Sequence, residues 1–244
     1  MLQPPARFSA TRRHLLASCA AVVATSIVGG CSTASNTSPA NDAATATPVQ
    51  VIPGGWLFFT PDEGALVEVL VDRLIPADPI TPGGKDAGVA VFIDRQLAGP
   101  YGSASALYMR PPFADGLPGQ GPQSPLTPAA RYRQALAALD QHCRDAFAGK
   151  AFREIPENQQ VAIIKRMESG DLVLYGSNGR AFFEVLLQNT KEGFFADPIY
   201  GGNRGMVAWK MIGFPGARYN YRDWVGRHNE RYPKPPIGLS GSAI

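Results

Sequence analysis

Cysteine and histidine, the side chains that most often hold metals or react covalently, are scarce in this sequence. Its 244 residues include only three of each. No pair of cysteines has the spacing of a zinc site, and no Cys-x-x-Cys-His sequence for covalent haem attachment occurs. A Gly-x-Ser-x-Gly nucleophile elbow and a phosphate-binding loop ending in Gly-Lys-Ser/Thr are also missing. The sequence therefore offers no catalytic, cofactor or metal site of its own.

An excess of positive charge is likewise missing from most of the chain. The formal net charge of +3 reflects 23 basic and 20 acidic residues. Three of the basic residues, Arg7, Arg12 and Arg13, lie in residues 1–30, which contain no acidic residue. The rest of the chain therefore has 20 basic residues against 20 acidic ones. A nucleic-acid-binding domain needs a basic patch or stripe, so we expect no nucleic-acid partner.

Residues 1–30 have the pattern of an export signal. Arg12 and Arg13 precede the apolar, small-residue run of residues 15–30, which matches the basic start and apolar core of a signal peptide. The run is shorter than the roughly 20 residues that span a bilayer as a helix. The sequence TRRHLL resembles the twin-arginine signal, an address read by a translocase. We predict a twin-arginine signal peptide and a periplasmic protein; the arginines of an ordinary secretion signal are the alternative.

A possible lipid attachment site and a tether follow the signal. The sequence Val-Gly-Gly-Cys at 28–31 resembles a bacterial lipobox, in which the cysteine is acylated, so Cys31 is the expected lipid attachment site. Cleavage near Ala34, with loss of Cys31, is the alternative. Residues 31–55 are rich in Ser, Thr, Ala, Asn and Pro, a composition that buries little apolar surface and predicts a flexible tether. A tether of this length reaches about 25–30 Å and would hold a folded body close to a membrane.

Residues 56–244 predict a single all-α domain with long ordered loops. Apolar residues recur at helical spacing, and no stretch alternates strictly as a strand would. Thr60, Pro61 and Glu63 match a capping box at a helix start. The loops at 100–126 and 191–244 contain aromatic residues, which argues against disorder. The expected helices run from Pro61 to before Pro76, from after Asp86 to before Gly99, from Pro128 through Phe147, from about Pro156 to Glu168, from a cap at Ser177 through Leu187, and, as a short element, within 205–212.

Cys143 lies on an apolar stripe of the third expected helix. A buried structural thiol fits this position, and a bridge to another chain is the alternative for an odd cysteine in an exported protein. Its neighbour His142 points about 100° away on a helix, so the two make a poor metal pair.

The segment GFFADPIYGGNRGMVAWKMIGFPG, residues 193–216, combines glycine with aromatic residues. It does not contain Gly-x-Gly-x-x-Gly, and no strand precedes it, so a dinucleotide site is not expected. Aromatic residues and arginine are favoured at protein interfaces. We predict a rigid contact surface for a partner; a loop that packs on the domain's own core is the alternative. The candidate contact residues are Tyr200, Asn203, Arg204, Trp209 and Phe214.

Three blocks of the sequence resemble one protein family. The blocks are LVDRLIPADPITPGGKDAGVAVFIDRQLAGPYG, PLTPAARYRQAL and FFEVLLQNTKEGFFADPIYGGNRGMVAWKMIGFPGAR. They are similar to the small (gamma) subunit of bacterial gluconate 2-dehydrogenase and of related membrane-bound sugar and polyol dehydrogenases. The resemblance covers most of residues 57–218, and the sequence DPIYGGN at 197–203 is its most distinctive part.

This resemblance implies a non-catalytic subunit. In such complexes a large FAD-containing subunit oxidises the sugar or polyol, and a cytochrome c subunit with c-type haem passes electrons toward quinone. The small subunit holds no cofactor and carries the twin-arginine signal, so it would serve the export and stability of the flavoprotein. The complex would be periplasmic and attached to the membrane through a lipid or a partner. The alternative is a stand-alone periplasmic enzyme or sugar-binding lipoprotein.

Overall fold

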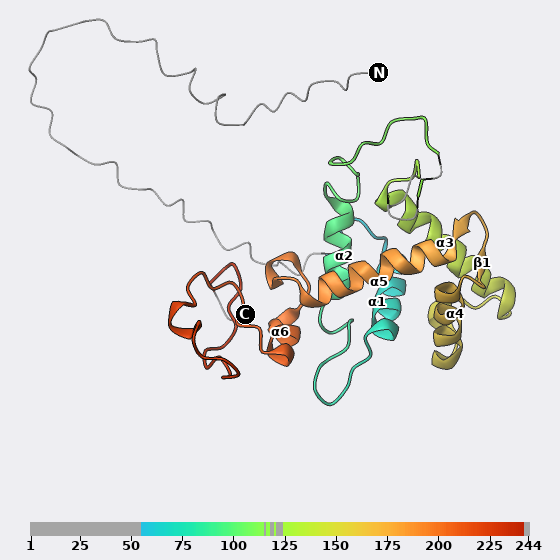
Figure 1. Ribbon diagram of the computed structural model, residues 1–244. Coiled ribbons are helices and arrows are strands. Elements are labelled where there is room, and N and C mark those ends of the chain that lie inside the picture. The colour runs from blue at the N-terminus through green and yellow to red at the C-terminus, as the bar shows by residue number, and fades with distance from the viewer. Residues whose placement is uncertain (1–54, 115, 118–119, 121–123, 242–244) are drawn as a thin grey trace, which may run out of the picture. The chain divides into compact units, whose positions relative to one another are not determined.

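The structure is a computed structural model that describes residues 55–114, 116–117, 120 and 124–241 (Figure 1). The predicted signal peptide with Arg12 and Arg13, the lipid candidate Cys31, and nearly all of the predicted tether lie outside these residues. Within them, six α-helices and one short hairpin confirm a mostly helical fold. The helices are α1 (Pro61–Leu74), α2 (Val89–Ala98), α3 (Pro128–Ala146), α4 (Glu157–Ser169), α5 (Gly179–Phe195) and α6 (Val207–Ile212).

Short elements connect these helices. Single 3-10 turns lie at Phe152–Glu154, Pro198–Tyr200, Arg204–Met206 and Arg222–Trp224. The hairpin joins β1 (Val173–Leu174) to β2 (Ser177–Asn178) in antiparallel pairing, with Val173 opposite Asn178 and Leu174 opposite Ser177. It is the one two-stranded sheet among the described residues.

Most helix boundaries follow from local signals, and one prediction about them is wrong. The capping box forms as expected: the Thr60 hydroxyl accepts from the Glu63 backbone N–H (3.2 Å), and the Glu63 carboxylate accepts from the Thr60 N–H (2.8 Å). Ser177 does not cap α5, because it is paired in the hairpin and the chain there is still extended. Asn178 is the cap instead, and its side-chain oxygen accepts from the Ala181 N–H at 3.0 Å.

Helix α5 is the central element of the body, since it contacts α1, α2, α3, α4 and α6 (Figure 1). Its buried face presents Phe182 and Leu186 to the other helices. On α4 the inward residues include Ile163, whereas Val161 is only half-buried, because it lies beside the apolar stripe. One side chain from each of the helices α1 to α5 illustrates the shared core: Leu70, Ile93, Leu136, Met167 and Phe182.

A buried polar contact lies beside this core. Asn189 of α5 is almost fully buried and donates to the hydroxyl of Tyr132 on α3 at 2.9 Å. Its amide is also within 3.2 Å of the hydroxyl of Tyr101, which reaches it from the loop after α2. Burial raises the pKa of Tyr132, so this phenol stays protonated and hydrogen-bonded. The network fixes the angle between α3 and α5 more narrowly than apolar packing alone would.

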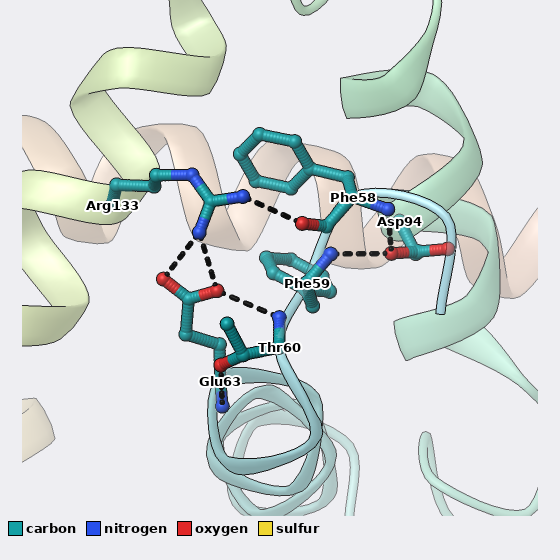
Figure 2. A network of polar contacts seen from close by, with 6 residues as sticks. All are labelled: Phe58, Phe59, Thr60, Glu63, Asp94 and Arg133. Atoms are coloured by element: carbon teal, nitrogen blue, oxygen red, sulfur yellow. Dashed lines mark hydrogen bonds and ion pairs between the residues drawn. The ribbon is translucent and has the colours of Figure 1, made fainter. Parts of the chain in front are cut away.

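The segment before α1 is held by the carboxylate of Asp94, a buried residue of α2. One carboxylate oxygen accepts from the backbone N–H groups of Phe58 and Phe59, both at 2.9 Å (Figure 2). The other accepts from the Leu57 N–H at 2.7 Å. A carboxylate that is 2% exposed needs such partners, because burying an unpaired charge is costly. The three bonds set the path of residues 57–59 past Asp94 on α2.

Residues 56–60, WLFFT, form what we call the N-terminal clasp. The Phe59 ring is buried against Tyr132, and the Trp56 ring lies against α1 at Gly64, where a β-carbon would be 2.1 Å from the indole. Arg133 of α3 secures the outer side: its guanidinium pairs with Glu63 (2.7 Å), donates to the Phe58 carbonyl (2.6 Å) and covers the Phe58 ring (Figure 2). The clasp thus links α1, α2 and α3.

We predict that Asp94→Ala destabilises the body by about 3 kcal/mol, because three backbone N–H groups lose their acceptor in a largely buried place. Asp94→Asn should lose less, since its amide oxygen can still accept from Phe58 and Phe59. Urea unfolding of the mature chain, followed by circular dichroism, measures both. Asp86→Ala is the control, because Asp86 is an exposed aspartate close to the same helix. Equal stability of the Asp94 and Asp86 variants would contradict the assigned role.

Candidate functional site

The glycine- and aromatic-rich segment forms the connection between α5 and α6. Asp197 starts it as an N-cap, accepting from the Ile199 N–H at 3.0 Å. The chain then passes through left-handed backbone conformations at Gly201 (φ 101°), Asn203 (φ 46°) and Gly205 (φ 63°). Glycine adopts such conformations without steric cost. These turns fold residues 197–206 back onto the body.

The glycines also allow backbone to approach backbone. A β-carbon at Gly202 would lie 2.1 Å from the carbonyl oxygen of Gly193 on α5, and one at Gly193 would lie 2.8 Å from the Phe92 ring on α2. Gly88, the N-cap of α2, would meet the carbonyl of Gly201 at 2.6 Å. The glycines of this segment therefore serve close packing against α2 and α5.

Two of the five predicted contact residues are buried inside this chain. Asn203 is fully buried; its amide donates to the Ala196 carbonyl, and its oxygen accepts from the Ala208 N–H, both at 2.9 Å. Trp209 is 6% exposed, and its indole N–H donates to the Phe195 carbonyl at 2.8 Å. These two residues join the segment to the ends of α5 and α6, and they offer little surface to a partner.

The other three predicted contact residues lie on the surface. Tyr200 and Phe214 are 48% and 44% exposed, and Arg204 is also exposed. The Arg204 backbone is fixed by donation to the Ala87 carbonyl at 3.0 Å, so its side chain extends from a rigid position. Further apolar side chains of α6, Met211 and Ile212, are exposed nearby in the sequence. Apolar and cationic side chains are thus exposed on this segment, whose backbone is held by hydrogen bonds.

The chain after Phe214 folds back on the segment between α5 and α6. Gly216 and Ile237 form a parallel bridge, with the Ala217 N–H donating to the Ile237 carbonyl at 2.7 Å. Asp197 takes part as well, because its second carboxylate oxygen accepts from the Leu239 N–H at 2.7 Å. The same aspartate thus caps the start of the segment and holds the C-terminal end of the described chain.

A groove lies between α6 and this returning chain. It has a volume of about 510 Å³, and its apolar lining includes Trp209, Phe214 and Tyr232. Its cationic lining consists of Lys210, Arg231 and Lys234. Tyr232 and the three cations, Lys210, Arg231 and Lys234, were not predicted as site residues from the sequence. The available signal was the cluster of basic residues and prolines in RYPKPP, residues 231–236.

Two potentially reactive side chains, Cys143 and His142, lie on α3. Cys143 is fully buried, and burial raises the pKa of its thiol to about 12. Burial, with a smaller contribution from Arg166, lowers the pKa of His142. Among the residues that the structure describes, no three His, Cys, Asp or Glu side chains gather in a way that could hold a metal ion.

No helix in the described part of the chain combines the length and apolarity needed to cross a membrane.

Comparison with family models assigns the chain to a protein family. The model for gluconate 2-dehydrogenase subunit 3 matches residues 61–216, and the chain belongs to this family. The match confirms the resemblance seen in the sequence and runs from the start of α1 to just beyond α6. Comparison with curated proteins and with solved structures gave no match. The family is named for one subunit of gluconate 2-dehydrogenase, which is consistent with an accessory subunit of a dehydrogenase complex.

We predict that Gly202→Ala loosens the segment between α5 and α6. The new β-carbon would meet a backbone carbonyl that cannot rotate away, and overpacking of this kind costs about 2 kcal/mol. Thermal unfolding and limited proteolysis between residues 195 and 207 measure the effect. Gly226→Ala is the matched control, because nothing lies within 4 Å of its β-carbon position. If the two variants melt alike, close approach at Gly202 is not a constraint.

Proposed function

We propose that this chain is the non-catalytic small subunit of a periplasmic, membrane-associated, flavin-dependent dehydrogenase complex that oxidises a sugar, polyol or sugar acid. The observation that carries the proposal is the family match across all six helices. The partners are a large subunit that holds FAD and oxidises the substrate, and a cytochrome c subunit that holds c-type haem. This chain holds neither cofactor, and its contribution is to bind, stabilise and export the flavoprotein.

The exposed part of the α5–α6 segment is the proposed contact for the large subunit. Tyr200, Arg204 and Phe214 present two aromatic rings and a guanidinium from backbone that is already fixed. Pre-ordered side chains lose little entropy on binding, which favours affinity. The buried Asn203 and Trp209 support this surface from beneath. The proposed interface therefore consists of an outer layer that touches the partner and an inner layer that positions it.

The export role concerns residues outside the described structure. A flavoprotein that folds around FAD in the cytoplasm has to cross the inner membrane in the folded state, and the twin-arginine route accepts folded proteins. The pair Arg12 and Arg13 in this chain would supply the address for both subunits. The small subunit would thus bind its partner before export and carry it across.

We predict that replacing Arg12 and Arg13 with lysine leaves the flavoprotein in the cytoplasm, although the flavoprotein itself is unchanged. Lysine preserves the charge, so general charge-dependent secretion should continue while arginine-specific recognition fails. Dye-linked dehydrogenase activity and immunoblots of cytoplasmic and periplasmic or membrane fractions measure the location of both subunits. Arg7→Lys is the control for an arginine outside the pair. Normal export of the flavoprotein with the double variant would refute the escort role.

We also predict that Cys31 is acylated in the mature protein. The apolar run ends in Val-Gly-Gly-Cys, and the residues after it form an uncharged stretch up to Asp42. More than one acyl chain on the cysteine would provide stable anchoring. The intact mass of the mature chain decides the question, since an unmodified N-terminus beyond Cys31 is incompatible with a lipid anchor. Cys31→Ser should release the chain from washed membranes only if the lipid, and not the partner, holds it there.

A further inference from the structure

The groove between α6 and the returning chain has two walls of different origin, and we call it the α6–tail groove. Lys210 and Phe214 lie on or directly after α6, within the family-matched residues 61–216. Arg231, Tyr232 and Lys234 come from the tail, beyond the end of that match. The groove is therefore formed jointly by the shared body and by a segment that the family model does not cover.

The charge of the groove is of one sign. Lys210, Arg231 and Lys234 are all exposed, and no acidic residue lines the groove with them. In the part of the chain that the structure describes, none of the three side chains makes a hydrogen bond or an ion pair. Glu230 is adjacent to Arg231 in sequence, but its carboxylate lies 3.8 Å from the guanidinium of Arg227.

Some of the other basic side chains of the body differ in this respect. Seven of them have acidic partners within the chain, for example Arg133 with Glu63 and Arg153 with Asp62, both at 2.9 Å or less. The three cations of the α6–tail groove thus retain their full capacity to pair with an external anion. Cationic side chains beside an apolar surface are suited to a ligand that carries both carboxylates and apolar groups.

The tail wall is held in place by backbone and ring contacts. The Arg218 guanidinium donates to the Pro235 carbonyl at 2.6 Å and lies 5.5 Å from the centre of the Tyr232 ring. The Trp224 ring meets Tyr232 edge-on at 5.1 Å. Prolines in the tail restrict its backbone further. The groove therefore exists before a ligand arrives, which lowers the entropic cost of binding.

We propose that the α6–tail groove binds an acidic segment of the large flavoprotein subunit. Aspartate or glutamate side chains of that segment pair with Lys210, Arg231 and Lys234, and an apolar side chain between them packs on Phe214 and Tyr232. The proposal rests on the proposed function, and it names the charge and shape of the partner's contact. A concave groove of about 510 Å³ accepts side chains of a peptide, whereas a flat lipid surface reaches only its rim.

The test reverses the charge of the groove in the assembled complex. The large subunit is co-expressed with this chain, and the affinity of the purified subunits for each other is measured by titration. The titration is run at about 50 mM and about 500 mM salt, because charge–charge interactions are screened much more strongly at the higher concentration. The variant carries Lys210→Glu, Arg231→Glu and Lys234→Glu together. We expect the affinity of this variant to fall roughly 100-fold at low salt. Raising the salt should weaken the affinity of the wild type but not that of the variant.

A matched control carries Lys150→Glu, Lys165→Glu and Lys191→Glu, which changes the net charge equally at exposed lysines away from the groove. It should bind the large subunit as the wild type does. Circular dichroism and thermal unfolding verify that both triple variants are folded. If the charge-reversed variant does not fold, a neutral variant with glutamine at the three positions replaces it. We expect this variant to lose less affinity for the large subunit, and its affinity should likewise not weaken as salt is raised.

The outcomes separate the inference from the proposed function. A complex that forms equally well, with equal salt dependence, in the groove variant and the control overturns the acidic-segment inference and leaves the subunit role intact. Failure of the wild-type chain to bind any flavin-containing dehydrogenase subunit overturns both. Vesicles containing phosphatidylglycerol provide the third arm. Loss of vesicle binding in the groove variant, with the flavoprotein bound normally, assigns the groove to the membrane and also overturns the inference.

Discussion

The carboxylate of Asp94 is the constraint on which closure of the helical body depends. It is buried on α2, and its partners are three successive backbone N–H groups of the N-terminal clasp, residues 56–60. A carboxylate in that position is stable only while the clasp is in place, and the clasp has no other acceptor for those N–H groups in the described structure. This mutual dependence fixes where Phe59 enters the core and where Thr60 begins α1. The position of α3 follows, because Arg133 binds Phe58 and Glu63 together.

The two ends of the described chain are secured by similar chemistry. Asp94 holds backbone N–H groups before α1, and Asp197 holds the N–H groups of Ile199 and of Leu239 near the C-terminal end. In both cases an aspartate on or next to a helix accepts hydrogen bonds from backbone N–H groups that have no helical carbonyl partner. The surface proposed for the large subunit lies on the segment between α5 and α6, which begins at Asp197. Its rigidity therefore originates in a capping residue and in glycines that permit close approach, while the residues that face solvent remain available for contact.

The sequence predicted the features that depend on neighbours along the chain. The capping box at Thr60 and Glu63 and the six helices were accessible because caps and apolar periodicity are local. Ser177 was mistaken for a cap because the sequence did not predict the hairpin. In the hairpin Ser177 pairs with Leu174, so α5 starts one residue later and Asn178 is its cap. Asn203 and Trp209 resembled contact residues because their partners, the carbonyls of Ala196 and Phe195, become neighbours only through the turns at Gly201 and Gly205. The α6–tail groove joins residues more than 20 positions apart, such as Lys210 and Lys234, and no local pattern reveals such a pairing.

The central place of α5 has a consequence for the order in which this protein is made. Synthesis proceeds from the N-terminus, and domains fold as units. Helices α1, α2 and α3 leave the ribosome first, but the helix that covers their apolar faces begins only at Gly179. During that interval the nascent chain carries amphipathic helices without the surface against which they pack. Chaperones have their longest opportunity to bind it then, and completion of the core coincides with emergence of the segment that follows α5.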